Sequence, residues 1–161
     1  MGTAPNDAAA WSHARRIATQ LGAWSVASLA VALALAVWAM GSTDGTAATL
    51  RGLAWQFALW GAIDGAIAAL GERDRRRRLA RGEGMDADAT RAFAARLRRL
   101  LRINAAVDVG YVAVGVALVL AWRTPAGLGH GLGVILQGGF LLAFDVWHGW
   151  RGPVGRAPHS G

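Results

Sequence analysis

The sequence contains no cysteine and no lysine, and charged residues make up only 17% of its 161 positions. Without cysteine the chain has no disulfides, no thiolate metal sites and no cysteine nucleophile, and the sequence does not indicate whether its compartment is oxidising or reducing. Without lysine, the formal net charge of +7 comes from arginine alone. Soluble domains carry roughly 25% charged residues, so the shortage of charge here indicates a lipid environment.

Four stretches of the chain are long and apolar enough to cross a bilayer, whose hydrocarbon core of about 30 Å takes roughly 20 helical residues. The first carries no formal charge, and the other three carry one acid each, Asp64, Asp108 and Asp145. They cover 21–40, 52–71, 103–122 and 129–150. Because they use about half of the chain, no separate soluble domain of ordinary size fits beside them. The sequence therefore predicts one all-α membrane domain over 1–161, a bundle of four transmembrane helices.

The segment between the second and third spans, residues 72–102, holds eleven of the seventeen arginines. Phe93, Leu97 and Leu101 recur at helical spacing, which predicts a basic amphipathic helix lying at the headgroups. We expect it to begin at a cap on Asp86 or Asp88 and to run into the third span as one helix over about 88–122. The expected partner is a bilayer with anionic headgroups rather than nucleic acid. The predicted headgroup contacts are Arg75, Arg76, Arg77, Arg78, Arg98 and Arg102.

The arginines fall on one side of the predicted spans. Two precede the first span, eleven separate the second from the third, and two follow the fourth, which leaves only Arg51 and Arg123 on the other side. Excess arginine in short loops marks the cytoplasmic face. We therefore expect a multi-pass protein of the inner membrane with both termini in the cytoplasm. The alanine-rich, lysine-free composition is typical of a bacterium with GC-rich DNA.

With this orientation the three acids lie at one depth, roughly 9 to 11 Å inside the cytoplasmic boundary at 1.5 Å per residue. An ionised acid at the centre of a transmembrane helix costs about 2.5 to 3.5 kcal/mol. The acids must therefore be protonated, paired with arginine, hydrated or bound to a cation. Other polar residues lie on the same helix faces as the acids or next to the layer that the acids form. The candidates for binding a proton or ligand are Asp64, Asp108, Asp145, Asn104, His148, Gln56, Gln137 and Tyr111.

Two functional hypotheses follow from this polar layer. The preferred one is a non-enzymatic structural or interaction subunit that packs with itself or with a larger membrane complex through polar contacts between helices. The alternative is a small carrier that binds a proton, cation or ligand at the acids. No catalytic residue, metal site or cofactor is expected. His130 and His148, for example, are separated by about 27 Å along one helix and cannot share a haem iron.

Three sequence patterns concern packing. Gln56 and Asp64 are eight residues apart, as are Gln137 and Asp145, which suggests two helical hairpins related as a parallel repeat. The glycine-rich run 127–133 predicts either tight packing or a local break in the fourth helix. Trp24, near one end of the first span, is expected at the membrane interface.

Three segments of the chain together resemble a family of small bacterial four-helix integral membrane proteins that is a domain of unknown function. They read WQFALWGAIDGAIAALG, NAAVDVGYVAVG and GHGLGVILQGGFLLAFDVWHG. The resemblance implies a fold and no activity. Asp64-Gly65 also resembles the DGxxAR opening of CDP-alcohol phosphatidyltransferases, but Ala69 stands in place of the arginine and Gly61 in place of the preceding acid. A membrane enzyme is thus the third hypothesis.

Overall fold

The computed structural model describes residues 5–151, and within this range the regular structure is helical. Four long helices follow one another: α1 (Pro5–Met40), α2 (Asp44–Ala80), α3 (Ala87–Ala121) and α4 (Pro125–Arg151). A short 3₁₀ turn, η1 (Glu83–Met85), joins α2 to α3. All four helices are long and apolar enough to cross a membrane. The predicted all-α bundle of four membrane-spanning helices is confirmed.

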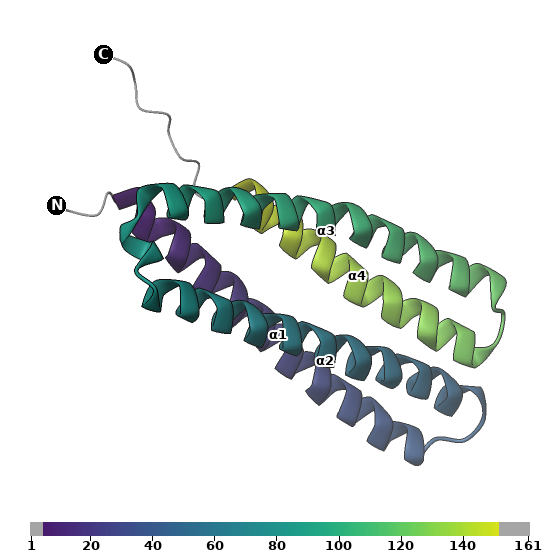
Figure 1. The fold of residues 1–161 in the computed structure, drawn as a ribbon. Helices are drawn as coiled ribbons and strands as arrows, with labels where there is room; N and C mark the ends of the chain where they lie inside the picture. Colours follow the sequence, from purple (N-terminus) through teal and green to yellow (C-terminus); the bar gives the residue numbers. More distant parts are fainter. Residues whose placement is uncertain (1–4, 152–161) are drawn as a thin grey trace.

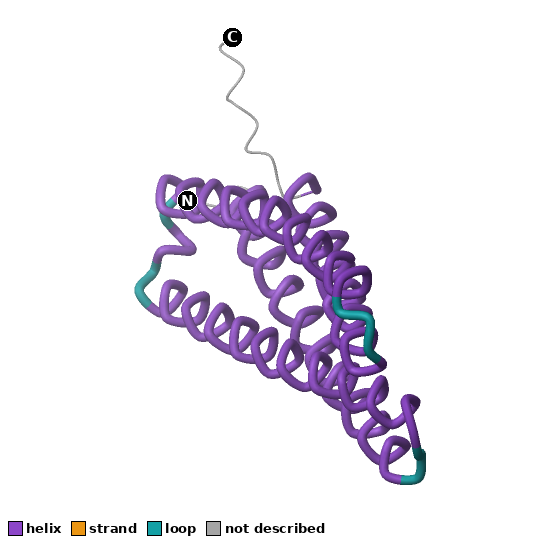
Figure 2. Tube along the Cα trace, turned by 90° about the vertical axis from the view of Figure 1, so that its right-hand side faces the viewer, coloured by secondary structure: helices purple, strands orange, loops and turns teal. Residues whose placement is uncertain are grey.

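The helices form two antiparallel hairpins, α1 with α2 and α3 with α4 (Figure 1). The hairpins pack on each other chiefly through α2 and α4, and α1 approaches α3 only weakly. The turns after α1 and α3 lie at one end of the bundle, and η1 lies at the other end together with the first residues of α1 and the last residues of α4 (Figures 1 and 2). Both described ends of the chain and the arginine-rich segment are therefore on the same side.

The side chains are distributed as lipid requires. Large apolar residues face outward, with Val26, Leu33 and Leu120 each about two-thirds exposed. The buried positions are mostly small or polar, such as Ala47, Ala54 and Ser28. Small residues let helix backbones approach closely, and polar residues inside the bundle avoid the hydrocarbon. The bundle thus hides its polar groups and presents its apolar ones.

The glycine-rich start of α4 is an unbroken helix, so of the two expected outcomes the structure has tight packing. An added Cβ on Gly52 of α2 would lie 2.9 Å from the backbone nitrogen of His130. A Cβ on Gly115 of α3 would lie 3.0 Å from the carbonyl oxygen of Gly131. Glycines therefore bring α4 into backbone contact with both α2 and α3.

α1 and α2 extend beyond the apolar spans at the arginine-rich end. α1 begins at Pro5 rather than near residue 21, and α2 continues to Ala80. Trp11 is 5% exposed; its indole donates a hydrogen bond of 3.1 Å to the hydroxyl of Thr90 and stacks on Phe93 at 4.2 Å. The basic half of α3 therefore packs on α1, and it continues into the span as one helix, as the sequence predicted.

The start of α3 follows the predicted capping chemistry. Of the two candidate caps, Asp86 is the one used, and its carboxylate accepts hydrogen bonds from the backbone N–H groups of Asp88 and Ala89. Such a cap satisfies backbone donors that have no partner inside the helix.

Candidate functional site

Asp64 of α2, Asp108 of α3 and Asp145 of α4 come together inside the bundle, and we refer to them as the three-aspartate cluster. They are 1%, 4% and 6% exposed. Asp145 lies next to Asp108 and Asn104, and Asp64 is close enough to interact electrostatically with both other acids. Three separate helices thus place their carboxyl groups in one buried region.

The cluster is incompletely satisfied. The Oδ2 atoms of Asp64 and Asp108 are buried and have no hydrogen-bond partner. Within the described part of the chain, no arginine or histidine forms an ion pair with any of the three acids. Arg102, the arginine nearest in sequence to Asp108, instead places its guanidinium 5.8 Å from the ring of Trp150. A buried polar group without a partner carries a free-energy cost of roughly 1 to 3 kcal/mol, and more if it is charged.

The contact between Asp108 and Asp145 has a chemical consequence. Two carboxyl groups that lie side by side in a buried region are not both ionised, so one of them holds a proton. Such a pair titrates as a unit. Among residues 9–151, no three histidine, aspartate or glutamate side chains are arranged so that they could hold one metal ion. The chemistry on offer is therefore that of a proton-holding carboxyl pair with a third acid beside it.

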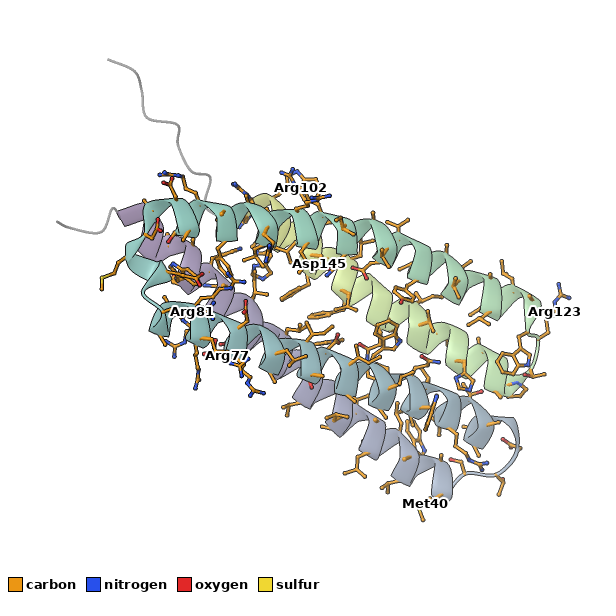
Figure 3. All side chains as sticks on the ribbon, viewed as in Figure 1. Met40, Arg77, Arg81, Arg102, Arg123 and Asp145 are labelled. Carbon is orange, nitrogen blue, oxygen red and sulfur yellow. The ribbon has the colours of Figure 1, made fainter. Side chains whose placement is uncertain are left out.

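A cavity of about 240 Å³ adjoins the cluster at the arginine-rich half of the bundle. Asp145 and Asn104 line it on the side of the cluster, and Asp74, Arg78 and Arg96 line it toward the helix ends. All four helices contribute to its largely apolar wall, which includes Ile17, Leu21, Ile67, Ala68, Leu97, Leu101 and Phe144. In Figure 3 Asp145 is seen between the ribbons of α3 and α4.

Gln56 and Gln137, which have the same spacing to an acid in the sequence, have different surroundings in the structure. Gln137 is fully buried; it accepts a hydrogen bond of 3.0 Å from the indole of Trp24 and donates one of 3.2 Å to Ser28. Gln56 instead contacts the ring nitrogen Nδ1 of His130 at 3.1 Å. One glutamine therefore ties α4 to α1, and the other ties α2 to α4.

His148 and Tyr111 contact residues outside the cluster. His148 is 3% exposed, and its Nε2 lies 2.8 Å from the amide oxygen of Gln20, with the ring of His13 centred 5.3 Å away. Tyr111 packs edge-on against Trp60 at 4.9 Å between ring centres. The structure thus brings together Asp64, Asp108, Asp145 and Asn104, whereas His148 of α4 lies beside Gln20 and His13 of α1.

Sequence reasoning missed the polar residues of α1. Trp24 was expected at the membrane interface; in the structure its ring packs against α4 and stacks on Phe140 at 3.7 Å between ring centres, a contact that the sequence did not predict. Ser25 donates a hydrogen bond of 2.7 Å to the carbonyl oxygen of Gly61. The available signal was Gln20, Trp24 and Ser28, which recur every four residues along one helical face.

Most of the arginines assigned to headgroups also have protein partners. Arg75 and Arg76 both pair with Glu72, at 2.7 and 2.6 Å, and Arg78 pairs with Asp74 at 2.8 Å. Arg102 lies over Trp150, Arg98 is half-buried, and Arg77 is exposed. Headgroup contact by these residues stays a prediction.

Comparison with known proteins gives one match. The model of a family of unknown function (DUF6992) matches residues 20–146, which includes the three-aspartate cluster and Gln137. No curated protein and no solved structure matches the chain.

Proposed function

We propose that this chain, which belongs to that family of unknown function, is a small multi-pass membrane protein whose three-aspartate cluster binds protons and exchanges them for a cation. The observation that carries the proposal is the pair of buried oxygens, Oδ2 of Asp64 and Oδ2 of Asp108, that have no partner. A group that served only to hold helices together would lose free energy by staying unpaired. A binding site keeps such groups for its ligand.

The polar contacts elsewhere in the bundle provide the comparison. Gln137 is as deeply buried as the acids, yet its amide oxygen and nitrogen both have partners, Trp24 and Ser28. These contacts are what a structural role requires. We therefore assign helix packing to the Gln137 group and binding to the cluster.

A second candidate function is a non-enzymatic structural or interaction subunit, the preferred hypothesis from the sequence. The hydrogen bond between Trp24 and Gln137 favours it, because that bond fixes how the two hairpins sit on each other. In this case the acids would act only as packing residues, and single Asn variants would keep the fold with a modest loss of stability, because an amide can still form hydrogen bonds.

We also propose that the protein lies in the inner membrane of a bacterium with both termini in the cytoplasm. The support is the clustering of arginine in one half of the bundle: Arg77, Arg81 and Arg102 all lie in that half in Figure 3, and Arg123 lies at the opposite end with Met40. Arginine in short loops favours the cytoplasmic side.

The experiment replaces Asp64, Asp108 and Asp145 singly by Asn in the full-length protein purified in detergent. We expect the melting temperature of the wild type to depend on pH, because the cluster holds a proton on buried carboxyl groups and releases it as the pH rises. The change should shrink in Asp108→Asn and Asp145→Asn, since an amide does not titrate.

Asp44→Asn serves as the matched control. Asp44 is the first residue of α2 at the other end of the bundle; it is exposed and accepts a hydrogen bond from the backbone N–H of Thr46 that an Asn oxygen can also accept. This variant should keep the full pH response. A wild type without pH response, together with three stable Asn variants, would refute the binding function and favour the structural one.

A further inference from the structure

The cavity beside the cluster has one acidic side and an apolar interior. Asp145 and Asn104 line the acidic side, while Leu97, Leu101 and Phe144 belong to the apolar wall. Asp145 in turn reaches Asp108, whose Oδ2 has no partner. A molecule in this cavity would therefore meet hydrocarbon along most of its surface and carboxyl oxygens at one place.

The size of the cavity limits the ligand. A dry apolar cavity of about 150 Å³ holds benzene, so the cavity of about 240 Å³ has room for one aromatic ring with a short substituent. The ligand is thus a small organic molecule.

The charged groups around the cavity determine the sign of the charge on the ligand. Buried carboxyl groups without a cationic partner favour a ligand that brings positive charge. At the opposite side Arg78 is already paired with Asp74 and with Glu83, at 2.8 and 3.1 Å, which reduces its repulsion of a cation. The ring of Phe144 adds an aromatic face to which a cation is attracted.

We propose that this cavity binds a small aromatic or aliphatic amine in its protonated form, with the ammonium group at Asp145 and the apolar part against α1 and α3. The inference rests on the proposed function, because it names the class of cation that the cluster exchanges for protons. The ammonium group takes over the role of the proton held between Asp108 and Asp145, and that proton is released. Binding is therefore tighter at higher pH.

Other ionisable groups surround the site and set the limits of this pH dependence. They are Asp64, Asp74 and Arg78 on α2, Arg96 on α3, His148 on α4, and His13 and Arg16 on α1. Of these, His148 is engaged with Gln20 and His13, and Asp64 belongs to the cluster. The release of the proton is consequently tested with variants of the cluster itself.

The probe is benzylammonium, compared with its neutral analogue benzyl alcohol and with the anion phenylacetate. In calorimetry on the full-length protein in detergent, we expect benzylammonium to bind and to release protons, with an affinity that rises as the pH rises. Asp145→Asn should weaken binding at least about thirtyfold, because it removes the charge from a buried charge-assisted contact. Benzyl alcohol and phenylacetate should bind far more weakly.

A cavity-filling variant separates this inference from the proposed function. Ala18 lines the cavity on α1 and carries no polar group, so Ala18→Phe should abolish benzylammonium binding and keep the pH-dependent melting temperature. Ala113→Phe is the matched control, since Ala113 is exposed on α3 and should leave binding unchanged.

Besides the absence of benzylammonium binding, three results would overturn the inference. The first is equal binding of benzyl alcohol and benzylammonium, which would mean an apolar cavity without charge selection. The second is preferential binding of phenylacetate, and the third is unchanged benzylammonium binding in Ala18→Phe. If benzylammonium does not bind while the wild type keeps its pH response, the amine site is refuted and the proton site stands; if both are absent, both proposals fail.

Discussion

The indole Nε1 of Trp24 donates a hydrogen bond of 3.0 Å to the amide oxygen of Gln137, which is 113 positions further along the chain. Gln137 is completely buried, and the Trp24 ring stacks on Phe140 of the same helix at 3.7 Å between ring centres. The backbones of α1 and α4 are not among the closely packed helix pairs. Side chains therefore connect the two helices across the bundle.

We predict that Trp24→Phe destabilises the bundle by about 1 kcal/mol, because hydrogen bonds between membrane helices contribute about 0.6 kcal/mol on average and up to about 1.7. The aromatic stack on Phe140 is largely retained, so the loss comes from the N–H group and leaves the oxygen of Gln137 unsatisfied. Unfolding in detergent mixtures measures the change.

A double-mutant cycle provides the test of this assignment. Trp24→Phe combined with Gln137→Leu should cost less than the sum of the two single changes, with a coupling of about 0.5 kcal/mol or more. Trp38→Phe combined with Gln137→Leu is the control cycle and should show no coupling, since Trp38 is 64% exposed on the outer face of α1. Strict additivity at the first pair would show that the bond contributes nothing to stability.

The second prediction concerns the contact between α2 and α4. A Cβ on Gly129 would overlap the backbone carbonyl of Thr49, which cannot move aside as a flexible side chain can. Gly129→Ala should therefore separate the hairpins and destabilise the protein by about 1 to 3 kcal/mol or more. Thermal unfolding measures the loss.

Gly139, in the same helix, is the matched control because nothing lies within 4 Å of its added Cβ. Gly139→Ala should leave the melting temperature unchanged or raise it, since alanine favours a helix over glycine by up to about 1 kcal/mol. Equal effects of the two substitutions would refute the close approach of α4 to α2.

The positions of the acids along their helices could be predicted from the sequence, while many of their partners could not. The helical rise is constant, so counting residues from the arginines placed Asp64, Asp108 and Asp145 at one depth. Hydropathy measures apolar length alone and could not show that α1 starts at Pro5. Trp24 was consequently placed at an interface, and its bond to Gln137 was missed.

The equal spacing of Gln56 to Asp64 and of Gln137 to Asp145 was also insufficient to predict the partners of the two glutamines. Spacing fixes depth and helical face, but the partner depends on which helix lies opposite. α4 is flanked by α2 and α3 and reaches α1 through side chains, so Gln137 meets Trp24, whereas Gln56 meets His130. Two positions with the same spacing thus have different roles.

The third prediction concerns pH at the turn between α2 and α3. The guanidinium of Arg81, 2.7 Å from Glu83, together with Arg78 holds the pKa of the Glu83 carboxyl below its ordinary value. A lowered folded-state pKa gives stability that is present above the unfolded value of about 4.3 and is lost as the pH falls through the folded value. The turn should therefore loosen only below about pH 4.

Hydrogen exchange at the backbone of η1, corrected for the intrinsic effect of pH, measures this loosening. Glu83→Gln should speed exchange at neutral pH and remove the acid-dependent step, because the amide carries no charge. The carbonyl of Glu83 accepts a bond of 3.2 Å from Thr90 that this variant keeps. An unchanged acid-dependent step in Glu83→Gln would assign it to another carboxylate.

The last prediction tests the orientation, and the absence of cysteine makes it direct because every introduced thiol is the only one. Thr43 lies in the turn between α1 and α2, is exposed, and makes no side-chain capping bond. Met85 lies in η1 at the opposite end and is 81% exposed. In intact spheroplasts a membrane-impermeant maleimide should label Thr43→Cys and spare Met85→Cys, and after lysis it should label both. Labelling of Met85→Cys alone in intact cells would reverse the orientation and would place the arginine-rich end outside, against the rule that short arginine-rich segments stay in the cytoplasm.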